Sequence, residues 1–138
     1  MVKATNETER LVLKFFETLS SGDLDKIRAA FHDEAVWDVQ VKGIEGEGSH
    51  RGKKAIVDEF LAPVRGMFKP GDPKVQVLSI ASQGPLAIGE AQGKGTFTDG
   101  RPYENLYAFA IEFKDGKVYR LREYMDSFYV AKLQGKAK

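Results

Sequence analysis

The sequence has no cysteine, only two histidines and no long apolar run, and each shortage removes a class of function. Without cysteine the chain has no disulfide framework, no thiolate nucleophile and no thiolate metal ligand. His32 and His50 are far apart in the sequence, so we expect no metal site. No apolar stretch approaches the length that crosses a bilayer, and no signal-peptide pattern is present. We therefore expect a cytoplasmic protein with no membrane partner.

An excess of charge of one sign is also missing. The chain has 21 Lys and Arg against 20 Asp and Glu, which leaves a formal net charge of +1, and the basic residues are scattered. Nucleic-acid-binding surfaces need a basic patch, so nucleic acid is not an expected partner. With 138 residues the chain is long enough to bury a core, and we predict one domain over residues 1–138, with 135–138 as a frayed tail.

The apolar periodicity predicts an α+β fold. Helical spacing of apolar residues predicts a helix from Asn6 to Ser20, a shorter one that Asp23 caps, and a third helix over 53–64 that Pro63 kinks or ends. Strict alternation predicts a first strand over 35–41, and a glycine-rich loop over 43–52 follows it. Four antiparallel strands then complete a curved sheet, mainly antiparallel, that wraps around the three helices as a cone.

The predicted strand over 86–98 has two unlike faces. One face consists of alanines and glycines, and small side chains let another surface approach closely. The opposite face carries Ile88, Glu90 and Gln92. We expect Glu90 to be a second acid of the site and Gln92 to be an amide that orients a ligand.

The stretch from Tyr103 to Asp126 predicts a β-hairpin around Asp115-Gly116. A two-residue turn would pair residues of opposite parity, whereas a three-residue loop with a glycine bulge pairs odd with odd, so we predict the bulged loop. The odd face is then apolar on both strands, except that it includes Glu123 with Tyr107 roughly opposite.

A carboxylate in an apolar stripe is costly unless it is paired or neutralised, because loss of water disfavours the ionised form and raises the pKa. Such perturbed groups cluster at functional sites, so Glu123 is the leading candidate for a catalytic residue. The alternative is a structural ion pair between Glu123 and one Arg or Lys.

The order of elements and several short motifs resemble the family that includes nuclear transport factor 2, ketosteroid isomerase and the SnoaL-like polyketide cyclases. The resemblance covers nearly the whole chain and implies the cystatin-like α+β cone. The segments that carry it are Ser21-Gly22-Asp23-Leu24-Asp25, Phe31, Gly52, Arg101-Pro102-Tyr103, Asp115-Gly116-Lys117 and Arg122-Glu123-Tyr124-Met125-Asp126.

The resemblance also reduces the number of reactions that we expect this protein to catalyse. The Arg-acid-Tyr segment is similar to the one in which limonene-epoxide hydrolases and phenazine-biosynthesis proteins keep a pocket carboxylate, and that position here is Glu123. Epoxide hydrolases add an Arg-x-Asp pair where this chain has Glu90 and Gln92, which argues against epoxide hydrolysis. Ketosteroid isomerases keep three polar catalytic groups at positions where this chain has only apolar ones, namely Val39, Phe15 and Phe109.

These observations predict an enzyme of small-molecule metabolism that needs no cofactor. Glu123 is expected to act as a general acid and base in a cyclisation, isomerisation or dehydration of an apolar carbonyl compound. Tyr107 and Asn105 are expected to bind the carbonyl or enolate oxygen. The predicted substrate-binding residues are Trp37, Val39, His50, Phe60, Gln92, Phe109, Leu121 and Met125.

Two alternatives stay open at this point. One is a noncatalytic module for ligand binding or dimerisation, in which Glu123 is permanently salt-bridged and side chains fill the cone. The other is an epoxide hydrolase that uses Glu90 and Glu123. We also predict a homodimer through the outer sheet face, because Leu106 and the neighbouring alanines of the hairpin are apolar enough to need cover.

Overall fold

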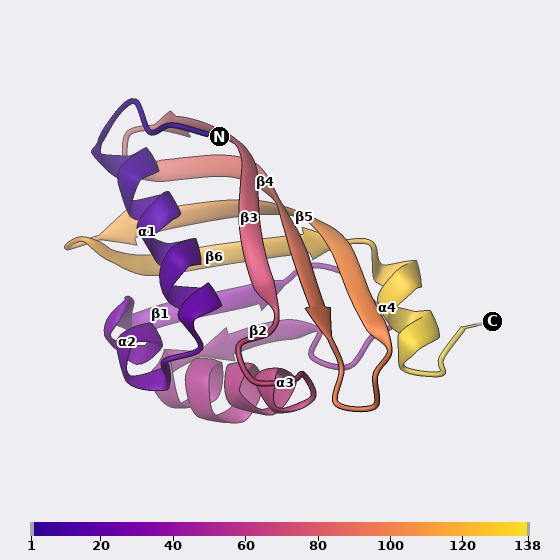
Figure 1. Ribbon diagram of the computed structural model, residues 1–138. Coiled ribbons are helices and arrows are strands. Elements are labelled where there is room, and N and C mark those ends of the chain that lie inside the picture. The colour runs from indigo at the N-terminus through magenta and orange to yellow at the C-terminus, as the bar shows by residue number, and fades with distance from the viewer. Residues whose placement is uncertain (1, 138) are drawn as a thin grey trace.

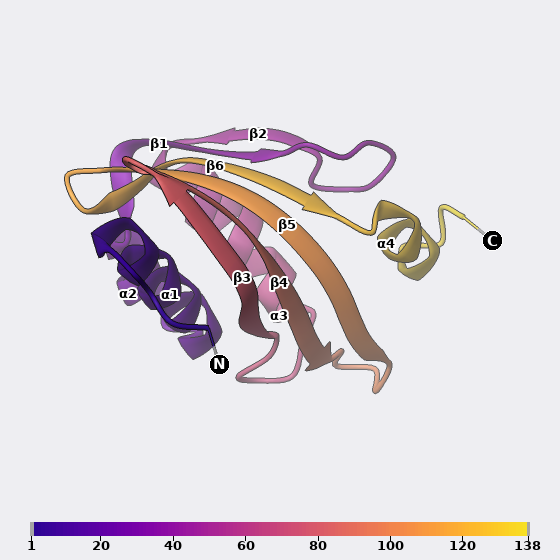
Figure 2. The same cartoon turned by 90° about the horizontal axis from the view of Figure 1, so that it is seen from above.

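The computed structural model describes residues 2–137, which form one curved six-stranded sheet with helices on its concave side (Figures 1 and 2). The strand order is β2-β1-β6-β5-β4-β3; β1 and β6 are parallel, and the other pairs are antiparallel. The expected α+β cone is therefore confirmed. The elements are α1 (Glu7–Ser21), α2 (Leu24–Ala29), β1 (Phe31–Val39), β2 (Gly48–Arg51), η1 (Lys54–Leu61), α3 (Ala62–Gly66), β3 (Lys74–Gln83), β4 (Leu86–Thr96), β5 (Pro102–Lys114), β6 (Lys117–Met125) and α4 (Ser127–Leu133).

The first two helices begin and end where the local sequence predicts. Asn6 caps α1 by accepting a hydrogen bond from the Glu9 backbone N–H at 2.9 Å, and Gly22 ends it with a φ of 70°. Asp23 caps α2 in the same way. The apolar face of α1 lies against the concave side of the sheet and is formed by Val12, Phe15, Phe16 and Leu19.

The first strand is longer than alternation predicted. It begins at Phe31 rather than at residue 35, because Phe31 pairs with Val118 of β6 before the register shifts. The predicted loop over 43–52 also contains strand β2, whose His50 pairs with Trp37 of β1. Cross-strand pairing therefore extends regular structure into polar and glycine-rich residues that show no alternation.

The third helix does not end at Pro63, so of the two predicted outcomes, a kink or an end at this proline, the end is wrong. Its first part, η1, is a π-helix in which the N–H of Ala62 donates to the carbonyl of Val57, five residues earlier. Pro63 then lies in the first turn of α3, where a missing N–H is tolerated, and the helix continues to Gly66. Phe60, on this π-helix, lines the cavity described below.

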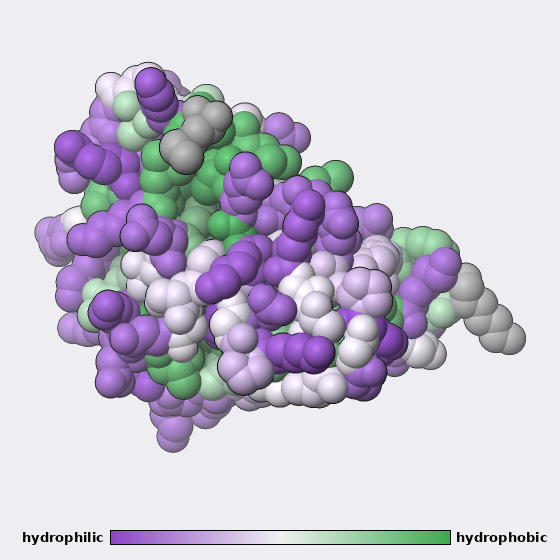
Figure 3. All heavy atoms as spheres, in the orientation of Figure 1, coloured by the Kyte–Doolittle hydropathy of each residue, from purple (hydrophilic) through white to green (hydrophobic). Residues whose placement is uncertain are grey.

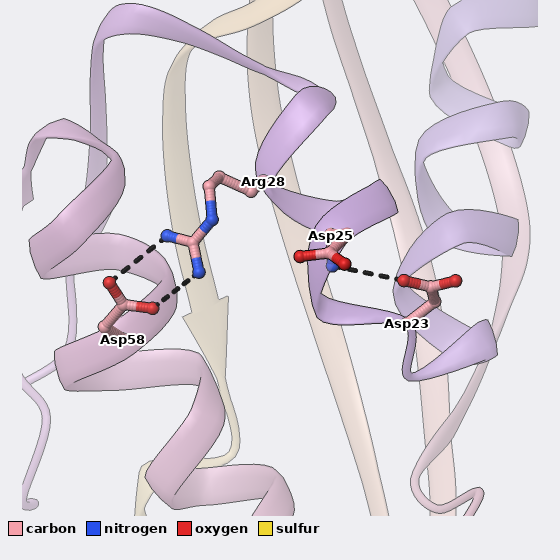
Figure 4. Close-up of polar contacts among 4 residues, drawn as sticks. All are labelled: Asp23, Asp25, Arg28 and Asp58. Atoms are coloured by element: carbon pink, nitrogen blue, oxygen red, sulfur yellow. Dashed lines mark hydrogen bonds and ion pairs between the residues drawn. The ribbon is translucent and has the colours of Figure 1, made fainter.

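A forked ion pair connects the second and third helices. The guanidinium of Arg28 on α2 donates two hydrogen bonds, at 2.7 and 3.2 Å, to the carboxylate of Asp58 on η1 (Figure 4). The pair raises the pKa of Arg28 and lowers that of Asp58. Because both groups are exposed, the pair orients the helices more than it stabilises the fold.

Hydrophilic side chains cover most of the face seen in Figure 3, and an apolar area lies in its upper part. None of the helices in residues 2–137 is long and apolar enough to cross a membrane. The helix α4 lies beyond the end of β6 (Figure 2), and it has no buried residue of its own. Its position matters because it closes one side of a cavity.

Candidate active site

The hairpin of β5 and β6 places Glu123 on the concave face of the sheet. Glu123 pairs with Phe109 of β5 and with Val39 of β1. The predicted pairing of odd with odd positions is confirmed there, but the predicted three-residue loop is wrong. Asp115 and Gly116 form a two-residue turn that pairs Phe113 with Val118, and a register shift between Glu112 and Phe113 then restores odd with odd. Tyr107, which was predicted to lie roughly opposite Glu123, pairs with Met125 instead.

Glu123 faces a cavity of about 580 Å³, a volume typical of small-molecule sites. The concave face of the sheet, η1 and α3, α4, the loop before β2 and the turn between β4 and β5 surround it. The residues that line it are Val39, Ile44, Glu45, Gly46, Phe60, Val64, Gly66, Met67, Phe68, Pro73, Phe97, Thr98, Asp99, Arg101, Tyr103, Tyr107, Glu123, Met125, Val130, Leu133 and Gln134.

The Glu123 carboxyl is held by a single hydrogen bond. The indole Nε1–H of Trp37 donates to Oε1 at 2.8 Å, and Glu123 forms no salt bridge with the rest of residues 2–137. Protein atoms surround the carboxyl, and this burial raises its pKa to about 7 despite the opposing effect of the Trp37 hydrogen bond. Oε2 accepts no hydrogen bond from the described residues and is open to the cavity.

Two tyrosines on β5 form the other polar part of the cavity. The hydroxyls of Tyr103 and Tyr107 are hydrogen-bonded to each other, and Asn105 Nδ2 donates to the Tyr103 oxygen at 3.2 Å. The two phenols share one hydrogen bond, so one hydroxyl proton of the pair stays available to a ligand. Burial raises the pKa of both tyrosines, which keeps that proton in place at neutral pH.

A family model described as a SnoaL-like domain matches residues 12–121, which is most of the chain; the match ends two residues before Glu123. The chain belongs to the SnoaL-like domain family. A search of curated proteins found no match.

Solved structures of low sequence identity share the fold of this SnoaL-like domain. A putative isomerase from Bacillus subtilis has a TM-score of 0.80 at 22% identity, with 96% of this chain and 98% of that chain covered. TerC co-crystallised with polyporic acid has a TM-score of 0.78 at 19% identity, covering 93% and 98%. A ketosteroid isomerase-like protein from Catenulispora acidiphila, in complex with trimethylamine, has a TM-score of 0.75 at 13% identity, covering 91% and 92%.

The structure corrects the predicted roles of Glu90 and Gln92. Both lie on the outer face of the sheet, where Glu90 accepts a hydrogen bond from Ser79 at 2.9 Å and Gln92 donates to Glu104 at 2.8 Å. The small residues of β4 face inward instead. A Cβ on Gly89 would lie 2.6 Å from the ring of Phe109 and 2.2 Å from a backbone oxygen, so only glycine fits there. The close approach comes from neighbouring strands, which left no room for a larger inward residue.

Asn105 also has a different position from the predicted one. Its side chain is buried behind the tyrosines, with Nδ2 donating to Tyr103 and Oδ1 accepting from the backbone N–H of Leu106 at 2.8 Å. It does not line the cavity, so it cannot bind a ligand oxygen directly. Its place in the site is to orient Tyr103.

The predicted ligand wall divides into two groups. Val39, Phe60 and Met125 line the cavity together with Tyr107 and Glu123. The remaining predicted contacts lie outside the lining: Trp37 holds Glu123, Phe109 packs on Phe16, Leu121 is buried in the core, and His50 stacks on Phe60 at a centroid distance of 4.1 Å.

Sequence reasoning missed an aromatic cluster that lines part of the cavity. Phe68, Phe97 and Tyr103 form a second buried cluster there, with Phe68 and Phe97 stacked at 4.5 Å. Tyr103 shares the odd face of β5 with Tyr107, and that parity could have found it. Phe97 lies within the strand predicted over 86–98 and shares the parity of its small residues, which could have found it as well. Phe68 lies outside the predicted and observed strands and meets Phe97 in one isolated bridge, so alternation gave no signal for it.

The cavity offers no evident metal site. Residues 2–137 contain no group of three or more His, Asp or Glu side chains that could hold a metal ion. The part of the cavity around Glu123 supplies one carboxyl of raised pKa, one available phenol proton and an apolar wall.

Proposed function

We propose that this SnoaL-like protein is an enzyme that moves a proton on an apolar, carbonyl-bearing small molecule without a cofactor. The observation that carries the proposal is the environment of Glu123. Protein atoms surround its carboxyl, which lacks a cation partner among the described residues, has one oxygen open to the cavity and has a pKa of about 7. A group poised near the working pH exchanges protons most efficiently in both directions.

The proposed reaction begins with Glu123 as the base. The carboxylate removes a proton from the carbon next to the substrate carbonyl, and the C–H electron pair moves to the carbonyl oxygen to give an enolate. The available hydroxyl of the Tyr103–Tyr107 pair donates a hydrogen bond to that oxygen, which stabilises the developing charge.

Glu123, now protonated, then completes the turnover as an acid. Return of the proton to a different carbon gives an isomerisation, and transfer to a departing hydroxyl gives a dehydration with release of water. Attack of the enolate carbon on a second carbonyl gives a cyclisation, with the proton delivered to the new alkoxide. Atoms and electrons balance in each case without an oxidant or a reductant.

The cavity wall supports a small organic ligand. Aromatic and aliphatic side chains supply most of it, and Phe60, Phe97 and Met125 are examples from three sides. Two similar structures hold small organic molecules, polyporic acid and trimethylamine, which is consistent with a ligand site in this fold.

The test is proton exchange on a panel of cyclic and aryl ketones in D₂O, followed by NMR. We expect the wild type to catalyse exchange of the α-proton for at least one ketone, and Glu123→Gln to lose about 10²- to 10⁴-fold of that rate. Glu90→Gln is the matched control, because it makes the same change on the outer face of the same sheet. Equal rates for wild type and Glu123→Gln would refute the proposed role of Glu123.

We propose in addition that the protein forms a homodimer through the outer face of the sheet. Ile88, Leu106 and Tyr124 lie on neighbouring strands of this face and are 55%, 57% and 43% exposed. Exposed apolar side chains grouped in this way mark contact surfaces. Light scattering is expected to give the mass of two chains for the wild type and of one chain for Leu106→Glu. A wild-type mass of one chain would contradict the dimer.

A further inference from the structure

The charges around the cavity favour a ligand of one sign. The ionisable residues that line it are Glu45, Asp99, Arg101, Tyr103, Tyr107 and Glu123, so three acids face a single base. Arg101 is already engaged, because its Nε donates to Asp99 at 2.8 Å and its Nη1 to the carbonyl of Leu133 at 3.3 Å. The lining therefore offers no uncommitted cation to an anionic ligand.

The carboxyl of Glu123, in contrast, has a vacant acceptor. Oε1 accepts from Trp37, and Oε2 is directed to the cavity without a protein donor. The groups that face it are the hydroxyls of Tyr103 and Tyr107 on β5 and the indole of Trp37 on β1, none of which is a cation. A buried carboxylate gains most from a partner that brings both a positive charge and a donor.

Anionic, neutral and cationic ligands are therefore expected to bind in this cavity with different affinities. An anionic ligand finds no compensating cation and requires Glu123 to keep its proton, which becomes more costly as the pH rises above 7. A neutral ligand can only use Glu123 as an ordinary hydrogen-bond partner. A cation pairs with the carboxylate, and the aromatic side chains of the wall suit both its carbon skeleton and its charge.

We propose that the cavity binds apolar amines in their protonated form, with the ligand ammonium donating to Oε2 of Glu123 and the carbon skeleton against the aromatic wall. The proposal rests on the proposed function in one respect, namely that the cavity is the ligand site. It adds a second class of ligand, which inhibits the proposed reaction instead of undergoing it. A bound ammonium holds Glu123 as the carboxylate and occupies the position of the substrate, so apolar amines inhibit proton transfer competitively.

The experiment uses three probes with one skeleton, 1-naphthylmethylamine, 1-naphthalenemethanol and 1-naphthoic acid, in titration calorimetry on the full chain. They are cationic, neutral and anionic at neutral pH and nearly equal in size. At pH 8 we expect the amine to bind at least tenfold more tightly than the alcohol, and the acid to bind more weakly than the alcohol. An alcohol that binds as tightly as the amine would overturn the inference.

Proton release separates pairing with Glu123 from simple attraction to the acidic cavity. At pH 6 a carboxyl with a pKa of about 7 is mostly protonated, so binding of the amine is expected to release about 0.9 proton and to be about tenfold weaker than at pH 8. Calorimetry in two buffers of different ionisation enthalpy measures that release. Amine binding without proton release would overturn the assignment to Glu123.

Two variants complete the design. Glu123→Gln is expected to lose both the preference for the amine and the proton release while it still binds the alcohol, which shows that the cavity is intact. Glu90→Gln is expected to match the wild type. If the alcohol binds and the amine has no advantage, only the inference fails. If neither neutral nor cationic probe binds the wild type, the cavity is no small-molecule site and the proposed function fails as well.

Discussion

Two glutamates of the cone, the buried Glu9 and the half-buried Glu123, have different environments. Glu9, in the first turn of α1, accepts four hydrogen bonds: two from Thr5, at 3.0 and 3.1 Å, one from Asn6 at 3.2 Å and one from Ser82 of β3 at 2.6 Å. These donors, led by Ser82, hold the pKa of Glu9 below its ordinary value. Glu123 has one donor and a pKa raised to about 7.

The comparison distinguishes a carboxylate that stabilises the fold from one that can exchange a proton with a ligand. Glu9 is buried and Glu123 is half-buried, so the exposed fraction of a side chain by itself does not identify a site. The number of donors decides the protonation state, because each hydrogen bond to the charged form compensates for lost hydration. Glu9 joins the start of α1 to β3 as a permanent anion, whereas Glu123 remains free to gain and lose a proton.

The largest expected effect is an opposite response of stability to Glu→Gln at the two positions. Glu123 keeps its proton up to about pH 7 in the folded state but only to about 4.5 in the unfolded chain, so the free energy of unfolding falls as the pH rises between these values. Glu123→Gln lacks that loss, and we expect it to be more stable than the wild type by about 2 to 3 kcal/mol at pH 8 and equal to it at pH 4.

Glu9→Gln is expected to change stability in the other direction. The lowered pKa of Glu9 stabilises the fold above the ordinary carboxyl pKa, and this contribution disappears as the pH falls. The variant should therefore be less stable than the wild type at pH 7, with a difference that shrinks in acid. Urea denaturation at several pH values measures both variants, with Glu90→Gln as the control. A Glu123→Gln variant that is destabilised at pH 8 would mean that Glu123 is a structural group.

A smaller effect is expected from Trp37→Phe, which removes the single donor to Glu123. The pKa of Glu123 should rise further, because the indole hydrogen bond is what opposes burial. We expect a stability cost of about 1 to 2 kcal/mol from lost packing and an upward shift in the pH midpoint of activity. A midpoint equal to that of the wild type would assign Trp37 to packing alone, and the same substitution in a Glu123→Gln background measures the coupling directly.

The smallest effect is expected from Ser82→Ala at the other carboxylate. Glu9 keeps three of its four donors, so its pKa should rise but stay below that of Glu123. The unfolding temperature should fall by a few degrees at pH 7 and less at pH 4. Ser79→Ala, on the exposed face of the same strand, is the control. A loss that is the same at both pH values would show that Ser82 acts independently of the Glu9 charge.

Much of the fold and the identity of Glu123 could be predicted from the sequence because both depend on short periods. The alternation on either side of Asp115-Gly116 gave the inward face of the hairpin, and Glu123 was the carboxylate on that face. Helical spacing gave the apolar face of α1 in the same way. These patterns are local, and the structure keeps them.

The sequence-based predictions were wrong or incomplete at positions whose environment depends on residues far away in the sequence. On β4 the inward residues are alanine and glycine, because Phe109 and the backbone of β3 occupy the space that larger side chains would need. Alternation alone therefore assigned Glu90 to the wrong face. Glu9 was not singled out, because its donors come partly from Ser82, far along the chain. The aromatic cluster around Phe97 likewise forms only when turns and helix ends meet.

The most direct test of the account is an NMR titration of the glutamate carboxyl carbons in the wild-type protein from pH 3 to pH 9. We expect Glu123 to titrate with a midpoint near pH 7 and Glu9 below its ordinary value of 4.5. Saturation with 1-naphthylmethylamine should move the midpoint of Glu123 downward and leave that of Glu9 unchanged. A Glu123 midpoint at or below 4.5 in the free protein would mean that a donor or cation holds the carboxylate, and the proposed chemistry would then have no acid to supply it.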